Sequence, residues 1–328
     1  MNILLTGGTG YIGSHTAVDL VEAGHKVVLF DNLSNSYRDV VVRIERIINQ
    51  RITFVEGDTR DTLLLSNTIK EKKVDAVIHF AGFKAVGESV KRPLEYFDNN
   101  VGGTISLLEA MQENQVKMLV FSSSATVYGE PQYLPIDENH PTSTTNPYGR
   151  TKLHIEGMLQ DVVSSDNAFG VVCLRYFNPF GANESGLIGE RPDGTPNNLM
   201  PFVSQVAAGK RAKVNVFGDD YPTVDGTGVR DYIHVLDLAS GHLAAINFII
   251  STKGWHAINL GTGYGSSVLE MIGQFASSSD RSIPYEVVGR RPGDVASCYA
   301  SAEKAEKLLK WKATRDLKSM CSSIWKWQ

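Results

Sequence analysis

The chain has 328 residues, of which 42% are hydrophobic and 21% charged, and its formal net charge is −4. This composition is typical of one large or two medium-sized globular domains, and the charge gives no electrostatic basis for binding nucleic acid or a membrane surface. Three scattered cysteines, the lack of an apolar run of about 18 residues, and a strand at the very start lead us to expect a cytoplasmic protein without a metal site, membrane helix or signal peptide.

A glycine-rich turn near the amino terminus is the first motif with a chemical meaning. Residues 2–5 form an apolar run that predicts a strand, and residues 14–23 carry apolar side chains at helical spacing. Gly7, Gly10 and Gly13 lie between or at the edge of these elements, three residues apart. Gly7 can make the tight turn, Gly10 lets the backbone approach a pyrophosphate, and Gly13 lets the helix pack on the strand. Because a helix N-terminus attracts anions, the pattern favours a dinucleotide site over a glycine turn without a ligand.

Asp31 indicates which dinucleotide binds. It follows a second predicted strand, 26–30, and lies 18 residues beyond Gly13. A carboxylate at this place can accept hydrogen bonds from the adenine ribose, whereas it would repel a 2′-phosphate. We therefore expect NAD rather than NADP.

Strand and helix patterns alternate through the first half of the chain. Further strands are expected at 52–55, 76–80, 118–122 and 171–176, and helices at 40–48, 62–70, 94–112 and 148–163. This alternation predicts an α/β fold of the Rossmann type, a doubly wound parallel sheet with helices on both faces. Ligands bind beyond the carboxyl ends of such strands, where Asp58, residues 80–82 and residues 122–124 follow predicted strands.

The character of the sequence changes after residue 177. Residues 178–201 are rich in Gly, Pro and Asn and predict a long loop, which in a compact domain is often functional. Short strands at 214–217 and 285–288 then mix with helices at 236–249, 268–277 and 302–309. We expect an NAD-binding Rossmann domain over 1–177 and a smaller, mainly substrate-binding C-terminal domain over 178–328, with 233–260 returning to the first.

Tyr148, Lys152 and Ser124 form the predicted catalytic group. The i, i+4 spacing places Tyr148 and Lys152 on one face of a helix that begins after Asn146 and Pro147, and Ser124 follows a neighbouring strand. A free tyrosine has a pKa near 10, so a general base at neutral pH needs that pKa lowered by roughly three units. The Lys152 ammonium and a positive nicotinamide ring would lower it, while Ser124 would hold the reacting hydroxyl. The alternative is a half-exposed tyrosine and a solvated lysine on an amphipathic helix.

Other polar residues are open to two interpretations. Arg230 and Arg291 are suited to a diphosphate, because guanidinium groups bind phosphate oxygens in pairs, but each is equally consistent with a loop ion pair. His15 and His79 are more typical of buried structural histidines than of catalysts.

Motifs spread over nearly the whole chain resemble those of the extended short-chain dehydrogenase/reductase family, and within it the nucleotide-sugar 4-epimerases. The matching stretches are Thr-Gly-Gly-Thr-Gly-Tyr-Ile-Gly-Ser-His-Thr at 6–16, His-Phe-Ala-Gly-Phe-Lys-Ala-Val-Gly-Glu-Ser at 79–89, Phe-Ser-Ser-Ser-Ala-Thr-Val-Tyr-Gly at 121–129, Asn-Pro-Tyr-Gly-Arg-Thr-Lys at 146–152, Leu-Arg-Tyr-Phe-Asn-Pro at 174–179, Pro-Asn-Asn-Leu-Met-Pro at 196–201 and Asp-Gly-Thr-Gly-Val-Arg-Asp-Tyr-Ile-His-Val at 225–235.

The resemblance implies an isomerase of galactose and nucleotide-sugar metabolism that interconverts UDP-galactose and UDP-glucose. Tightly bound NAD would oxidise and reduce sugar carbon 4, with Tyr148 as acid and base at the 4-hydroxyl, Lys152 tuning it and Ser124 orienting the oxygen. The residues that the resemblance places around NAD, together with the three glycines, are Tyr11, Ile12, Asp31, Asn32, Asn35, Ser36, Asp58, Thr59, Phe80, Ala81, Gly82, Lys84, Asn99, Tyr148, Lys152 and Phe177. Those around the UDP-sugar are Lys84, Ser124, Tyr148, Asn178, Asn198, Leu199, Phe217, Arg230, Arg291, Asp294 and Cys298. It also implies a homodimer that packs helices from 94–112 and 148–163 of each subunit into a bundle.

Two alternative functions are compatible with parts of this pattern. Dehydratases and decarboxylases of nucleotide sugars share the fold, but similar dehydratases carry Asp-Glu where this chain has Ala125 and Thr126. An NAD-sensing protein without activity is the other rival, and such proteins tend to lose the tyrosine or the lysine. Cys298 stands where some family members have a bulky tyrosine, so we expect room for an N-acetyl group and activity on UDP-N-acetylglucosamine and UDP-N-acetylgalactosamine.

Overall fold

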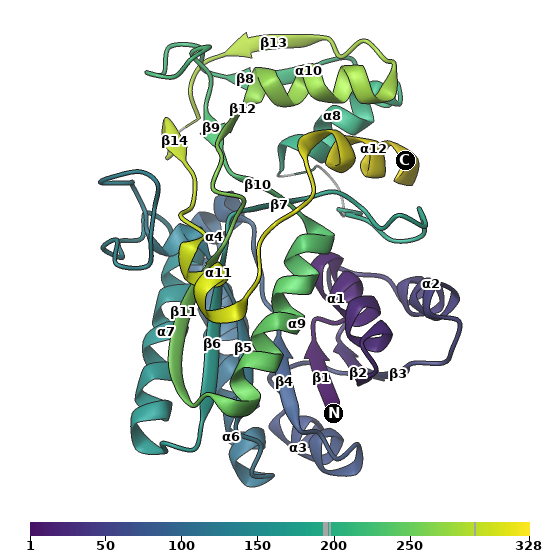
Figure 1. Ribbon diagram of the computed structural model, residues 1–328, viewed down its shortest axis with the longest axis vertical. Helices are drawn as coiled ribbons and strands as arrows, with labels where there is room; N and C mark the ends of the chain where they lie inside the picture. The colour runs from purple at the N-terminus through teal and green to yellow at the C-terminus, as the bar shows by residue number, and fades with distance from the viewer. Residues whose placement is uncertain (193–195, 197, 292) are drawn as a thin grey trace.

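A seven-stranded parallel sheet forms the lower part of the computed structural model, which describes residues 1–192, 196, 198–291 and 293–328 (Figure 1). The strand order is β11-β6-β5-β4-β1-β2-β3, so the winding direction reverses between β1 and β4. The strands are β1 (Asn2–Thr6), β2 (Lys26–Asp31), β3 (Thr53–Glu56), β4 (Ala76–His79), β5 (Met118–Ser124), β6 (Gly170–Tyr176) and β11 (Gly254–Leu260). A crevice for ligands forms at the carboxyl ends of the strands where such a reversal occurs.

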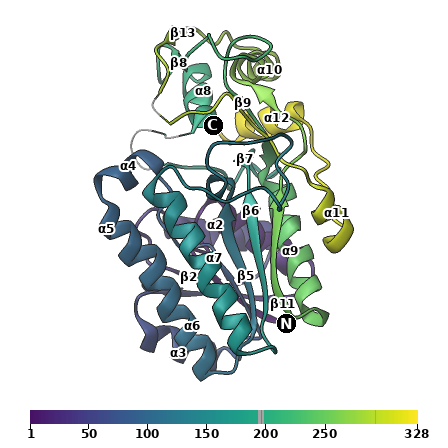
Figure 2. The ribbon, with the colours of Figure 1, turned by 90° about the vertical axis from the view of Figure 1, so that its left-hand side faces the viewer.

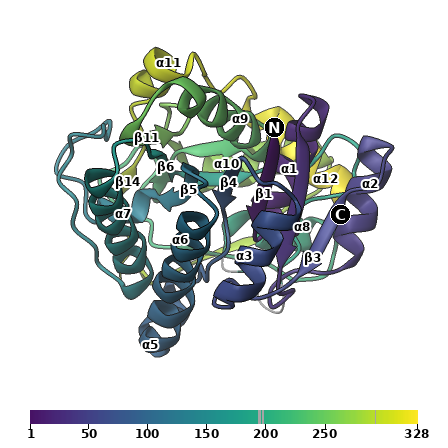
Figure 3. The ribbon, with the colours of Figure 1, turned by 90° about the horizontal axis from the view of Figure 1, so that it is seen from below.

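The sheet is apolar on both faces because helices cover both. Along β1, Ile3 and Leu5 belong to one core cluster and Leu4 to the other. One face carries α1 (Tyr11–Glu22), α2 (Asp39–Ile48), α9 (Val235–Ser251) and α11 (Glu303–Leu309), and the other α3 (Thr62–Glu71), α6 (Gly103–Glu113) and α7 (Pro147–Ser165), as the view from below shows (Figure 3). The predicted doubly wound parallel sheet is thus confirmed.

The helix expected at 94–112 is interrupted. It consists of α5 (Pro93–Tyr96), a wider turn η1 (Phe97–Gly102) and α6, and a short helix α4 (Val86–Lys91) precedes it. Pro93 occupies the first turn of α5, where its missing N–H costs no helical hydrogen bond. These helices lie beside α7 on the outer face of the sheet (Figure 2).

Most of the later elements form a layer above the carboxyl ends of the sheet strands (Figures 1 and 2). Its helices are α8 (Leu199–Ala207), α10 (Val268–Ser279) and α12 (Leu317–Trp327), which bury Met200, Phe275 and Ile324 in a core of their own. The short strands pair as β7 (Asn178–Phe180) with β10 (Tyr232–His234), β8 (Val214–Phe217) with β13 (Tyr285–Val288), and β9 (Val229–Arg230) with both β12 (Ser266–Ser267) and β14 (Ser297–Cys298).

Part of the second half of the chain packs on the sheet. The strand β11 pairs in parallel with β6, and α9 packs beside α1. Helix α11 and Trp311 join the same core, and the Trp311 indole N–H donates to Ser240 Oγ at 2.9 Å. The division of the chain at residue 177 into two domains stays a prediction.

The long loop expected at 178–201 is shorter than predicted. It contains β7, and α8 already begins at Leu199. Asn197, which is part of a motif behind the resemblance, lies outside the described residues. Of the helices that the structure describes, none is long and apolar enough to cross a membrane.

Candidate active site

The glycine turn after β1 forms a cradle that fits a pyrophosphate. Gly7 has φ +69°, and its N–H donates to Phe30 O at 2.8 Å. A Cβ on Gly7 would lie 2.7 Å from Ala81 N, and one on Gly13 only 2.3 Å from Gly7 O. Helix α1 begins at Tyr11, and no side chain caps its Gly10 end. Its first N–H groups therefore remain available for phosphate oxygens.

Asp31 is held at the end of β2 by three donors. Its Oδ1 accepts from Leu33 N at 2.9 Å and from Ser36 Oγ at 3.0 Å, and its Oδ2 accepts from Thr9 N at 3.1 Å. The carboxylate is buried and fixed in orientation. Oδ1 already accepts two hydrogen bonds, whereas Oδ2 keeps a lone pair with which it can accept from a ribose hydroxyl.

Asp58, another predicted NAD contact, lies beside the loop that follows β2. Its Oδ2 accepts from Asn32 Nδ2 at 2.9 Å. Arg60 bonds both Asp58 and Asp98, and its guanidinium holds the pKa of the Asp58 carboxyl well below the usual range. Thr59 is buried, while Asn35 is exposed.

The residues after β4 line the other side of this site. The ring centre of Phe80 lies 4.8 Å from the ring centre of His242, and Ala81 N donates to Thr6 O at 3.1 Å. Gly82 follows them, and Phe177 is buried at the far end of β6. Asn99 Nδ2 donates to Asn100 Oδ1 at 3.0 Å.

Tyr148 and Lys152 come from the first turns of α7. The helix begins where Asn146 Oδ1 accepts from Gly149 N at 2.8 Å and Pro147 fills the first position. Lys152 Nζ donates to Ser122 O at 2.7 Å and lies 6.0 Å from the centre of the Tyr148 ring. Burial lowers the pKa of Lys152 to about 8.

Ser124 ends β5 opposite the start of α7. Its Oγ accepts from Thr126 N at 3.2 Å and from Thr126 Oγ1 at 3.0 Å. Burial raises the pKa of Tyr148, and the Ser124 hydroxyl and the Lys84 charge only partly oppose this. The lowered tyrosine pKa expected from the sequence is therefore not a property of the chain by itself, because desolvation outweighs the Ser124 hydrogen bond and the Lys84 charge.

A cavity of about 380 Å³ opens in the upper layer, lined by residues of β7, α8, β8, β9, β10 and the loops beside them. It is lined by seven of the residues predicted to bind the UDP-sugar, namely Asn178, Asn198, Leu199, Phe217, Arg230, Arg291 and Asp294. Arg291 pairs with Asp294 at 2.9 Å and lies 5.4 Å from the Phe217 ring centre. The guanidinium of Arg230 is held by the Val229 carbonyl at 2.8 Å. Two cations and an exposed aromatic ring suit a nucleoside diphosphate.

Cys298 is not among the described residues that line this cavity. It lies on β14, paired with Arg230 of β9, and packs against the cluster that contains Tyr128 and Phe177. Burial raises the pKa of its thiol to about 11, so the thiol stays protonated. This argues against thiol chemistry at Cys298.

Several residues that line the cavity were not predicted as site residues from the sequence. Glu190, Asn215, Tyr221 and Tyr232 all line the cavity. Their neighbours in the sequence are ordinary loop and short-strand residues, so only the folded chain reveals them. His79 is buried, and its Nδ1 lies 2.6 Å from Thr6 Oγ1 and its Nε2 3.0 Å from Thr104 Oγ1. These contacts fit the interpretation of His79 as a structural histidine.

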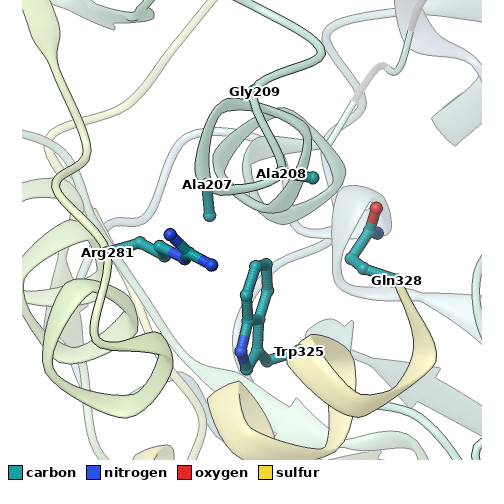
Figure 4. Close-up of a pocket in the computed structure, with 6 residues that line it drawn as sticks. All are labelled: Ala207, Ala208, Gly209, Arg281, Trp325 and Gln328. Atoms are coloured by element: carbon teal, nitrogen blue, oxygen red, sulfur yellow. The ribbon is translucent and has the colours of Figure 1, made fainter.

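A second cavity, of about 480 Å³, lies between the end of α8 and α12 (Figure 4). The side chains of Arg281 and Trp325 meet there, and the guanidinium carbon of Arg281 lies 6.0 Å from the centre of the Trp325 ring. None of the predicted site residues lines it. Within the described ranges, no group of three or more His, Cys, Asp or Glu side chains lies close enough to hold a metal ion.

Comparison with known proteins identifies relatives over the whole chain. A family model described as GDP-mannose 4,6 dehydratase matches residues 4–324. The UDP-glucose 4-epimerase of Bacillus subtilis (strain 168) is 54% identical over 328 residues, which cover 100% of this chain and 97% of that protein.

Solved structures agree with these relatives. UDP-glucose 4-epimerase from Stenotrophomonas maltophila, with bound NAD and formylated UDP-arabinopyranose, has a TM-score of 0.98 at 52% identity and covers 100% of this chain and 97% of its own. The enzyme from Bifidobacterium longum in complex with NAD⁺ and UDP has a TM-score of 0.97 at 51% identity, with 100% and 98% covered. Similarity of this extent in both sequence and fold means that the chain belongs to the UDP-glucose 4-epimerase family, within the extended short-chain dehydrogenases/reductases.

Proposed function

We propose that the protein interconverts UDP-galactose and UDP-glucose by reversible oxidation at sugar carbon 4, with NAD as a resident cofactor. The observation that carries the proposal is that Tyr148 and Lys152, at the start of α7, contact Ser124 and Ser122 at the end of β5, in a chain that also has an open glycine turn after β1 and a cavity with two arginines. The relatives with NAD and UDP ligands support the same interpretation.

The chain's own residues account for the proton and for the substrate's orientation. Ser124 holds the 4-oxygen, and Tyr148 takes the 4-hydroxyl proton and later returns it. Burial raises the pKa of Tyr148, so the base form depends on the positive charges of Lys152 and Lys84 and on the nicotinamide ring. NAD, held by the glycine turn and Asp31, would supply the reversible oxidation at carbon 4. Arg230 and Arg291 would bind the diphosphate while the oxidised sugar rotates to present its other face to the cofactor.

A dehydratase is the nearest alternative, since the matching family model bears such a name. Ala125 and Thr126 occupy the short η2 turn after β5. The Thr126 hydroxyl donates to Ser124 Oγ at 3.0 Å, and neither residue offers a carboxyl group. The chain therefore lacks, at these positions, an acid to expel a hydroxyl and a base to remove a C5 proton. A sensing role without catalysis is disfavoured because both Tyr148 and Lys152 are present.

The proposed substrates include the N-acetylated UDP-hexoses, because Cys298 is much smaller than a tyrosine. The proposal keeps the protein in the cytoplasm, where its three free cysteines stay reduced. It also includes a homodimer through the helices within 94–112 and 148–163, which are α5, α6 and α7. Leu94 is 82% exposed there, and Ile105 is exposed as well, so a dimer would cover apolar side chains that a monomer leaves in water.

The test of the main proposal is incubation of the purified protein with UDP-galactose, followed by separation of the sugar nucleotides. We expect UDP-glucose to appear until the two reach a fixed ratio, with no other product. Formation of a 4-keto-6-deoxy sugar would favour a dehydratase instead, and binding of NAD without any conversion would favour a sensor.

A further inference from the structure

Glu190 links Lys84, which follows β4 of the sheet, to the cavity residue Asn198 through one carboxylate oxygen. Its Oε1 accepts from Lys84 Nζ at 3.1 Å and from Asn198 Nδ2 at 3.0 Å. Lys84 lies between β4 and α4 on the sheet side, whereas Asn198 is the N-cap of α8 in the upper layer. The Glu190 side chain is only 15% exposed and belongs to the cavity lining.

The backbone of Glu190 is fixed independently of these side-chain contacts. Its carbonyl accepts from the Trp327 indole N–H at 3.3 Å. Further back in the same segment, the Tyr11 hydroxyl donates to Gly181 O at 2.6 Å and Arg43 Nη1 donates to Leu187 O at 3.1 Å. The chain thus brings the carboxylate to the cavity from a segment anchored on both α1 and α12.

Lys84 connects Glu190 with the predicted base. The charge of Lys84 acts to lower the pKa of Tyr148, and Glu190 is the first cause of the raised pKa of Lys84 itself. A carboxylate beside the lysine offsets part of the positive field that Tyr148 experiences. Since about half of the Lys84 side chain is exposed, at 52%, water screens part of this interaction.

Both partners of Glu190 are also predicted substrate contacts. Lys84 and Asn198 carry donors suited to the neutral hydroxyl oxygens of a UDP-sugar. A ligand that takes these donors competes directly with the Glu190 oxygen. We propose that Glu190 is a positioning residue that holds Lys84 and Asn198 and partly neutralises Lys84 before substrate binds, and that the substrate breaks this arrangement and frees the charge of Lys84 to act on Tyr148. This inference rests on the proposed epimerase function.

Other charged or titratable groups lie on α7 itself and on the elements packed against it. They include Arg150, Lys152, His154, Glu156 and Asp161 on α7, Glu88 and Lys91 on α4, Glu95 and Tyr96 on α5, Asp98 on η1, Cys173, Arg175 and Tyr176 on β6, and His256 on β11. Glu156 is paired with Arg175, Asp98 with Arg60, and Glu88 accepts from Tyr96. None of these groups contacts Glu190, so a change at Glu190 reaches Tyr148 through Lys84.

The test is Glu190→Gln in the NAD-loaded protein. Glutamine keeps an oxygen that can accept from Lys84 and Asn198, and removes only the negative charge. Without that charge the Lys84 cation acts fully on Tyr148, the phenolate becomes easier to form, and its pKa falls. We expect the acid limb of kcat/KM, which reports the free enzyme, to move to lower pH by about half to one unit. The limb of kcat should stay in place, because bound substrate has already separated the pair.

Two control variants distinguish a shift in the pKa of Tyr148 from a nonspecific change in charge or in ligand affinity. Glu184→Gln removes the same charge from a side chain that is 78% exposed in the same segment, and should move neither limb. A mere gain in affinity for the anionic ligand would scale the whole kcat/KM profile without moving its limb. Glu190→Ala removes charge and acceptor together and should move the limb in the same direction as the glutamine variant.

A second readout does not need activity. The phenolate absorbance of the free NAD-loaded protein, corrected with Tyr148→Phe in each background, should titrate at lower pH in Glu190→Gln than in the parent. Equal midpoints in the two would overturn the inference, as would a limb that stays fixed in Glu190→Gln while Glu190→Ala merely loses activity. If the unmodified protein does not interconvert the UDP-hexoses, the proposed function fails, and the absorbance titration alone decides the effect of Glu190 on Tyr148.

Discussion

Lys152 Nζ lies 6.0 Å from the centre of the Tyr148 ring, one helical turn away on α7, and donates at 2.7 Å to the carbonyl of Ser122 on β5. The lysine is thereby tied to the strand that ends in Ser124. Its buried charge faces the phenol from a fixed position. We propose that Lys152 influences the protonation of Tyr148, and this relationship can be tested from both sides.

Replacement of Tyr148 by phenylalanine removes the proton acceptor and leaves the ring in its buried site. We expect kcat to fall by roughly 10² to 10⁴, the usual contribution of a positioned acid or base, while NAD is retained. Steady-state rates and the cofactor content of the purified variant are the measurements. A variant that turns over at the parent rate would exclude Tyr148 as the base.

Replacement of Lys152 by methionine keeps most of the side-chain volume and removes the charge. Loss of a nearby cation raises the pKa of Tyr148, so the acid limb of the pH–rate profile should move to higher pH and kcat should fall at neutral pH. This is the opposite direction from Glu190→Gln. The control is Lys91→Met, which changes an exposed lysine of α4 and should leave the limb in place. A limb that does not move in Lys152→Met would separate the lysine from the base.

Much of this arrangement follows from the sequence because it depends on neighbours in the chain. Strands such as β1 and β4 are buried on both faces, so their sequences are continuous apolar runs that predict strands. Gly7 and Gly13 lie in the predicted turn, where a Cβ on either residue would clash with neighbouring backbone atoms. Tyr148 and Lys152 lie one helical turn apart, and their pairing needs only the helix.

The remaining parts depend on contacts between distant segments. The two-residue strands β9 and β14 form only by pairing between distant segments, β14 with β9 and β9 also with β12, and no local sequence pattern predicts them. Glu190 is 106 residues from Lys84 in the sequence, and nothing near either residue indicates that they form a pair. Burial also raises the pKa of Tyr148, which spacing alone could not reveal.

NAD should accompany the protein through purification and remain unchanged by turnover. The oxidation and the reduction at carbon 4 cancel within each cycle, so the reaction needs no external oxidant. We expect UDP-galactose to be converted in the absence of added NAD, without net formation of NADH, as followed by its near-ultraviolet absorbance. Steady accumulation of NADH during conversion would contradict this cycle.

Asp31 should enforce the choice of cofactor. Its carboxylate is fixed by Thr9, Leu33 and Ser36 and would repel the 2′-phosphate of NADP. Asp31→Ala should narrow the difference in affinity between NAD and NADP, measured by calorimetry on cofactor-stripped protein. Equal binding of both cofactors by the parent protein would rule out this role.

Cys298→Tyr tests the proposed acceptance of N-acetylated sugars. Cys298 precedes Tyr299 at the end of β14 and packs on Phe177 and its neighbours, next to the strand that carries Arg230. A phenol ring is far larger than a thiol, so in this position it would fill the space that an N-acetyl group at sugar carbon 2 needs. We expect kcat/KM for UDP-N-acetylglucosamine and UDP-N-acetylgalactosamine to fall sharply in the variant, while the values for UDP-glucose and UDP-galactose change little.

The matched control is Cys298→Ser, which is close in size to the parent and should retain both activities. It also separates space from thiol chemistry, because the raised thiol pKa already argues for an inert cysteine. Cys298 does not itself line the described cavity, so the tyrosine must act by projecting from β14 toward the sugar. If the parent cannot use the acetylated sugars, or if the tyrosine variant loses both activities to the same degree, then Cys298 does not set the size of the sugar pocket.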